Sequence, residues 1–147
     1  MLVKASVDDL RIVAAARKIT LNANVPTTPT IIACHRPSIE RLLANLTENA
    51  INYSEAGGSV NLHVTTQADD VVLRVEDEGM GIDPAHLPHI FEPFYRADAA
   101  RNTRTGGNGL GLTSVKHIVD DHNGRIDVQS TLGEWTTFIV TFPAATP

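Results

Sequence analysis

The strongest constraint on the fold is a pair of strand-like runs that ends in a carboxylate and a glycine loop. Val60 to Thr66 and Val71 to Asp77 are rich in β-branched residues, and residues 67–70 between them suit a turn. The second run leads directly into Asp77-Glu78-Gly79-Met80-Gly81-Ile82. A carboxylate there can accept a hydrogen bond from an exocyclic amine such as that of adenine, and glycines let a flat ring approach the backbone. Asp-x-Gly-x-Gly is also an ordinary turn after a strand, so this segment alone permits both interpretations.

Length and charge narrow the class of protein. The 147 residues fit one domain, 1–147, with one core. The composition, with 42% hydrophobic and 20% charged residues, predicts a soluble globular chain. A formal net charge of -5 argues against a general nucleic-acid binder. Cys34 is the single cysteine, which excludes an internal disulfide and fits a reducing compartment. The apolar run at residues 12–16 is too short to span a bilayer, and no secretory signal is visible. The sequence is compatible with a piece of a larger protein.

Helical and strand-like patterns alternate irregularly along the chain. Helical periodicity is expected at Val7–Lys18, Ser38–Tyr53, Pro84–Ile90 (a short helix) and Gly109–His122. Strands are expected at Leu21–Val25, Thr30–Cys34, Val60–Thr66, Val71–Asp77, Arg125–Thr131 and Thr136–Phe142. Residues 93–108 form a long polar loop, and such loops are often functional. The order predicts an α+β fold, with helices on one face of a mixed, mostly antiparallel sheet.

The helix from Ser38 to Tyr53 carries a line of asparagines. Successive residues of a helix step by about 100°, which groups the apolar residues on one side and Asn45, Asn49 and Asn52 on its flank. Asparagine is a mediocre helix former, and carboxamide oxygens there suit a hydrated Mg²⁺ and nucleotide phosphates. Tyr53 lies between the two groups, where its ring can touch a base or sugar, and Glu48 points away from the core. An amphipathic helix with a polar flank is the alternative.

The last expected helix has a glycine-rich start, Gly106-Gly107-Asn108-Gly109-Leu110-Gly111-Leu112. Exposed amides at a helix N-terminus favour a bound phosphate. Leu112 excludes both a P-loop, which needs lysine there, and a dinucleotide fingerprint, which needs glycine. A flexible hinge is the alternative, but each such glycine costs up to about 1 kcal/mol against alanine, which favours a ligand. The cations Arg96, Arg101 and Arg104 precede it, and they either neutralise phosphates or lie in a solvated loop.

Taken in order, these segments resemble the ATP-binding catalytic domain of two-component sensor histidine kinases. That superfamily also contains gyrase, the ninety-kilodalton heat-shock chaperone and the MutL proteins. Asn45 to Tyr53 resembles the N box, Asp77 to Gly81 the first glycine box, Phe91 to Arg96 the F box and Gly107 to Gly111 the second glycine box. Residues 133–138 resemble a weaker third box. The resemblance runs from Ile39 to Phe142.

The resemblance implies a two-layer α/β sandwich of the Bergerat type, with ATP and Mg²⁺ as cofactors. It implies that Asn49 ligands Mg²⁺, that Asn45 supports the phosphates and that Asp77 binds the adenine amine. Arg96 would act with Asn49 as a catalytic residue, and residues 95–109 would form a mobile ATP lid. The nucleotide-contacting residues implied are Asn45, Asn49, Asn52, Tyr53, Asp77, Gly79, Gly81, Ile82, Arg96, Gly107, Gly109, Leu110, Gly111, Leu112 and Thr136.

Two positions depart from the family pattern. Asn52 stands where the family often has lysine, which removes one phosphate cation that Arg96, Arg101 or Arg104 would have to replace. Trp135 stands where the third box usually has glycine, so no ligand contact is transferred to it.

The sequence also bears on whether ATP is hydrolysed. Hydrolysing relatives place a glutamate four residues before the metal asparagine, and here that position is Asn45, whose amide cannot act as a general base. The nucleophile would come from outside, because Cys34-His35-Arg36-Pro37 lacks the acidic residue that follows a phosphoacceptor histidine. The resemblance therefore predicts a histidine kinase catalytic domain, monomeric in isolation. Its partners would be its own dimerisation and phosphotransfer domain and a response regulator, within a membrane-anchored, homodimeric parent whose catalytic domain is cytoplasmic. An anti-sigma-factor serine kinase and a non-catalytic nucleotide-binding module are the alternatives.

Overall fold

The computed structural model describes residues 10–12, 14–24, 36–67, 70–92 and 111–143. Helical residues 10–12 and 14–16 come first. They are followed by the elements β1 (Thr20–Asn24), α2 (Arg36–Tyr53), β2 (Ser59–Gln67), β3 (Asp70–Asp77), the 3-10 turn η1 (Leu87–His89), α4 (Gly111–Asp121), β4 (Arg125–Thr131) and β5 (Trp135–Pro143).

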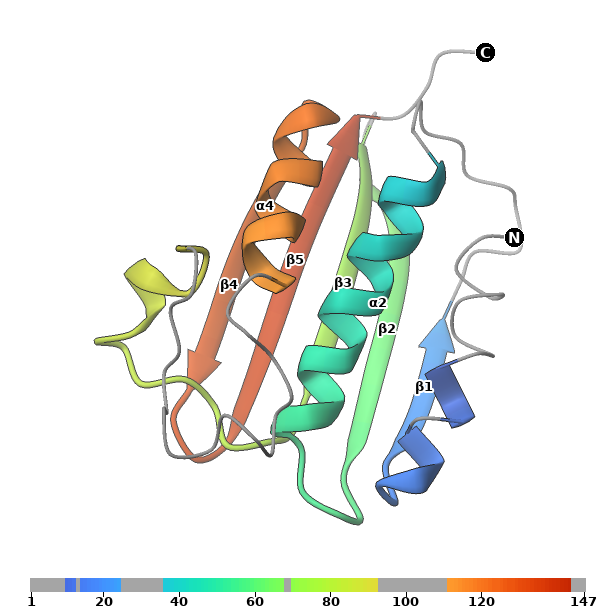
Figure 1. The fold of residues 1–147 in the computed structure, drawn as a ribbon, viewed down its shortest axis with the longest axis vertical. Coiled ribbons are helices and arrows are strands. Elements are labelled where there is room, and N and C mark those ends of the chain that lie inside the picture. Colours follow the sequence, from blue (N-terminus) through green and yellow to red (C-terminus); the bar gives the residue numbers. More distant parts are fainter. Residues whose placement is uncertain (1–9, 13, 25–35, 68–69, 93–110, 144–147) are drawn as a thin grey trace.

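The strands form one mixed sheet in the order β1-β2-β3-β5-β4. β1 runs parallel to β2, and the pairs β2–β3, β3–β5 and β4–β5 are antiparallel. α2 and α4 lie side by side over the same face of this sheet (Figure 1). The predicted two-layer α+β architecture is confirmed.

The core fills the space between the helices and the sheet. Alternate residues of β3, Leu73 and Val75, face the helices and pair with Val140 and Phe138 of β5. The apolar stripe of α2 packs against them through Leu42, Leu43, Leu46 and Ala50, and α4 adds Val115, Ile118 and Val119. Each fully buried leucine contributes about 2 kcal/mol to stability, so the packing of α2 fixes the position of its polar flank.

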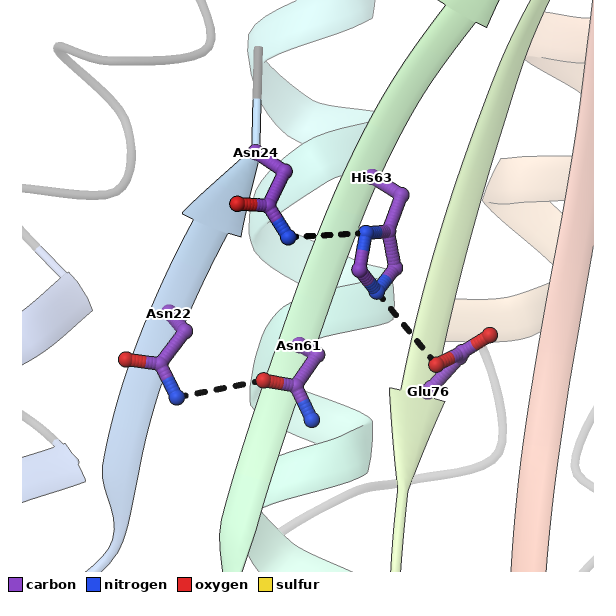
Figure 2. Close-up of polar contacts among 5 residues, drawn as sticks. All are labelled: Asn22, Asn24, Asn61, His63 and Glu76. Carbon is purple, nitrogen blue, oxygen red and sulfur yellow. Dashed lines mark hydrogen bonds and ion pairs between the residues drawn. The ribbon is translucent and has the colours of Figure 1, made fainter.

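The opposite face of the sheet is polar. Asn22 Nδ2 of β1 lies 3.1 Å from Asn61 Oδ1 of β2, and Asn24 Nδ2 lies 3.0 Å from His63 Nδ1. His63 Nε2 lies 3.4 Å from a carboxylate oxygen of Glu76 on β3. Figure 2 shows these side chains in front of the sheet with α2 behind it. This face is therefore well separated from the polar flank of α2.

Most predicted elements agree with the structure to within two residues, and one is wrong. The short helix expected at Pro84–Ile90 is reduced to the single turn Leu87–His89, because Pro88 removes a backbone donor that a longer helix needs. The strand expected at Thr30–Cys34 and the loop at residues 93–108 lie outside the described residues. In the described parts of the chain, no helix has the length and apolar character needed to cross a bilayer.

Candidate nucleotide site

Asp77 is a buried carboxylate at the end of β3. It is 4% exposed, and its Oδ1 accepts a hydrogen bond from the Gly79 amide at 2.9 Å. Desolvation raises the pKa of Asp77 to about 6, and the Gly79 hydrogen bond opposes that shift. Burying a carboxyl group costs free energy, and buried groups with shifted pKa values are concentrated at functional sites. Asp77 is therefore a candidate site residue.

The loop after Asp77 is held so tightly that two of its positions accept only glycine. A Cβ on Gly79 would lie 2.2 Å from the carbonyl oxygen of Tyr53. Gly81 has φ +67, and a Cβ there would lie 2.2 Å from the carbonyl oxygen of Thr131. The amide of Met80 also donates to the Tyr53 carbonyl, at 3.2 Å. The loop is therefore fixed between the end of α2 and the turn that joins β4 to β5.

A small hydroxyl network supports the same loop from the sheet. Thr136 lies opposite Asp77 in the β3–β5 register, is 4% exposed, and places its Oγ1 2.8 Å from Ser130 Oγ. Ser130 Oγ accepts from the Ile82 amide at 2.7 Å and donates to the Trp135 carbonyl at 2.9 Å. Because the Ser130 hydrogen is used on Trp135, Thr136 acts as the donor to Ser130. Sequence reasoning missed Ser130, although the hairpin register that pairs it with Thr136 contains this information.

The asparagines of α2 lie half-buried on the flank predicted for them. Asn45 Nδ2 donates to the carbonyl of Gly111 at 3.3 Å, which places this flank beside the start of α4. Asn52 Oδ1 accepts a hydrogen bond from Arg17 Nη1 at 2.5 Å, a contact that no local pattern indicates. Glu48 is exposed.

α2 links the two groups of residues. Its last residue, Tyr53, touches the glycine loop through its carbonyl, and Asn45 touches Gly111 eight residues earlier. At 1.5 Å per residue, these two contacts are about 12 Å apart along the helix axis.

The structure describes eleven of the fifteen residues predicted to contact a nucleotide: Asn45, Asn49, Asn52, Tyr53, Asp77, Gly79, Gly81, Ile82, Gly111, Leu112 and Thr136. Ile82 and Leu112 are partly buried and pack against the core. Arg96, Gly107, Gly109 and Leu110 lie outside the described residues. Among the residues that the structure describes, there is no group of three or more His, Cys, Asp or Glu side chains that could hold a metal ion.

Comparison with known proteins agrees with this arrangement. Residues 34–146 match the family described as histidine kinase-, DNA gyrase B-, and HSP90-like ATPase. The chain belongs to this family, and it is the ATPase-type catalytic domain that sensor histidine kinases contain.

Among curated proteins, the sensor histidine kinase YkoH of Bacillus subtilis is 42% identical over 112 residues, which cover 76% of this chain and 24% of YkoH. The sensor protein SrrB of Staphylococcus aureus is 40% identical over 105 residues, which cover 71% of this chain and 18% of SrrB. The chain therefore spans about a quarter or less of these relatives.

Solved structures show the same fold. The mycobacterial sensor histidine kinase MprB superimposes with a TM-score of 0.86 at 26% identity, over 99% of this chain and 95% of that one. Full-length ShkA in complex with AMPPNP gives a TM-score of 0.85 at 26% identity, over 99% of this chain and 30% of ShkA.

Proposed function

We propose that this domain binds Mg-ATP and transfers its γ-phosphoryl group to a histidine on a separate dimerisation domain, as one part of a two-component sensor kinase. The observation that carries the proposal is the buried Asp77 at the end of a central strand, next to a loop that accepts only glycine at two positions. Membership of the ATPase family and the named sensor kinases among its relatives support it.

At one end of the site, Asp77 accepts a hydrogen bond from the exocyclic amine of adenine. Gly79 and Gly81 carry no side chain, so the base can approach the loop backbone. The Thr136–Ser130 pair holds the Ile82 amide and with it the far side of the loop. The ring of Tyr53, the last residue of α2, would cover the base or the ribose.

At the other end, the asparagine flank binds the phosphates and the metal. Asn49 supplies a carboxamide oxygen, a hard donor that fits Mg²⁺, which keeps most of its waters and takes one or two protein ligands. The bound ion would neutralise phosphate charge during transfer. Asn45 supports the phosphates next to the start of α4, and Arg96 with the amides of Gly107, Gly109, Leu110 and Gly111 completes the phosphate contacts through a lid at residues 95–109.

The site suits transfer better than hydrolysis. Asn45 occupies the position from which a glutamate would activate water, and an amide does not take a proton near neutral pH. The neighbouring acid, Glu48, is exposed and lies on a different side of α2. The domain therefore positions ATP for an external nucleophile, and its contribution to the reaction is orientation and charge stabilisation.

The partners follow from this function. The dimerisation domain would present the acceptor histidine, and a response regulator would receive the phosphoryl group. We propose a homodimeric, membrane-anchored parent with this domain on the cytoplasmic side.

The test combines binding and transfer. Calorimetric titration should show Mg-ATP binding to the native chain and a loss of about 1–3 kcal/mol in Asp77→Asn, the cost of losing a buried hydrogen bond to a charged group. Mixing the chain with its dimerisation domain and ATP should give acid-labile phosphate, as phosphohistidine requires. Acid-stable phosphate on a partner would indicate a serine kinase, and brisk ATP hydrolysis by the chain alone would refute the assignment.

A further inference from the structure

The asparagine flank of α2 is joined to a cation from a distant segment. Arg17 follows the first helical residues, 35 positions before Asn52, and its Nη1 donates to Asn52 Oδ1 at 2.5 Å. The contact is partly buried, so solvent screens it less than an exposed pair. The formal net charge of the chain is -5, so a partly buried cation on this flank is notable.

The backbone around Arg17 is held firmly against the end of α2. The Arg17 amide donates to the Ala14 carbonyl at 3.0 Å, and the Gly57 amide donates to the Lys18 carbonyl at 2.9 Å. Lys18 itself has φ 59, which reverses the chain just after Arg17. The guanidinium therefore reaches Asn52 from a fixed base, and its position does not depend on a loose surface chain.

The chemistry of the pair points to an anion. A guanidinium only donates hydrogen bonds, so the oxygen of Asn52 must face Arg17 and its amide group must face elsewhere. An oxygen in contact with a cation is a poor ligand for a second cation, whereas an amide donor beside a guanidinium suits a phosphate oxygen. One helical turn earlier, Asn49 is half-buried on the same flank, and its carboxamide oxygen is of the kind that binds Mg²⁺.

We infer that Arg17, held by Asn52, is a further phosphate-binding residue of this site, and that the pair divides the asparagine flank into a metal-binding part at Asn49 and an anion-binding part at Asn52. The inference rests on the proposed function, since it assigns a residue to the same nucleotide site. It also gives the segment before β1 a role in binding, because Arg17 belongs to that segment.

The test is a titration of adenosine, ADP and ATP, with Mg²⁺, into the native chain, Arg17→Gln and Lys18→Gln. Lys18 is the matched control, because it is the adjacent exposed cation and its loss changes net charge equally. Arg17→Gln should weaken the binding of ADP and ATP about three- to tenfold relative to Lys18→Gln, the order expected for the loss of one partly screened charge. This difference between the two variants should shrink in high salt. Adenosine affinity should be the same in both variants.

Two further variants separate binding from folding. Arg17→Lys keeps the charge and should retain more ADP affinity than Arg17→Gln. In the Arg17→Gln background, Asn52→Lys returns an ammonium group to the flank and should recover ADP and ATP affinity. The inference is overturned if Arg17→Gln affects adenosine as much as ATP, if it matches Lys18→Gln for every ligand, or if it lowers only the melting temperature. A native chain that binds no adenosine and no ATP would instead refute the proposed function.

Discussion

The two ends of the candidate site are built in different ways. At the base end, Asp77 and the glycine loop are buried and fixed by backbone contacts to α2 and to the β4–β5 turn. At the phosphate end, Asn45, Asn49 and Asn52 are half-buried side chains on one helix, and hydrogen bonds of the Asn45 and Asn52 side chains join this helix to other segments. If the proposed function holds, the base would meet a wall held by backbone contacts, and the phosphates would meet side chains that can adjust during transfer of the γ-phosphoryl group.

Adding a single methyl group to the glycine loop should disrupt the base end. Gly79→Ala should lower the free energy of unfolding by about 3 kcal/mol and abolish ATP binding, because its Cβ would overlap the Tyr53 carbonyl. Gly133→Ala is the control: its φ of +82 is unfavourable for alanine, but no atom of the described residues lies within 4 Å of the new Cβ. It should cost about 1 kcal/mol and leave binding intact. Urea denaturation with calorimetric titration measures both, and equal effects of the two variants would contradict a clamped loop.

The buried carboxylate at the base end should lower stability as the pH rises. The pKa of Asp77 is about 6 in the folded chain, against 3.8 for an unperturbed aspartate, so between these two pH values the native state keeps a proton that the unfolded chain has lost. The contribution of the protonated Asp77 to the free energy of unfolding is therefore fully present below pH 3.8. It is lost as the pH rises through 6, and the total loss is up to about 3 kcal/mol.

The check is the free energy of unfolding of the native chain minus that of Asp77→Asn, measured from pH 4 to pH 7. The difference should fall steadily with pH, and it should not change if Asp77 has an ordinary pKa. Adenosine affinity of the native chain should change in the opposite direction, rising as the carboxylate ionises, since the charged form is the stronger acceptor.

The phosphate end should respond to a change that leaves the base end untouched. Asn49→Ala should weaken Mg-ATP binding about tenfold, which corresponds to about 1.4 kcal/mol of binding free energy, and it should leave the affinity for adenosine unchanged. Asn61→Ala removes an asparagine from the opposite face of the sheet (Figure 2) and should affect neither ligand. A loss of adenosine affinity in Asn49→Ala would mean that the two ends are not separable.

The smallest expected effect concerns α2, which joins the two ends. Thr47 Oγ1 is buried and has no hydrogen-bond partner among the described residues, so Thr47→Val should stabilise the chain by about 1 kcal/mol. Ser54→Ala is the matched comparison and should destabilise the chain, because the buried Ser54 Oγ donates a hydrogen bond to the Ala50 carbonyl at 2.8 Å. Thermal unfolding distinguishes the pair, and a destabilised Thr47→Val would show that its hydroxyl has a partner.

At both ends, the sequence predicts the elements that carry the site but not the contacts that hold their side chains. The fold, the strand that ends at Asp77 and the asparagine flank follow from local periodicity, which a single segment contains. The Arg17–Asn52 contact depends on how distant segments dock, so no local pattern reveals it. The Ser130–Thr136 contact can be inferred only once the register of the β4–β5 hairpin is known. The short helix at Pro84–Ile90 was predicted from its first proline, and the second one, Pro88, limits it to one turn.

Amide and side-chain NMR spectra recorded during titration with Mg-AMPPNP report on both ends of the site and on the opposite face of the sheet in one experiment. If the nucleotide binds along this site, signals of Gly79, Gly81 and Thr136 and the Asn49 carboxamide will shift together with one dissociation constant, while those of Asn22, Asn61 and His63 will stay in place. Shifts confined to the opposite face, or nucleotide binding that leaves Gly79 and Gly81 unchanged, would contradict it.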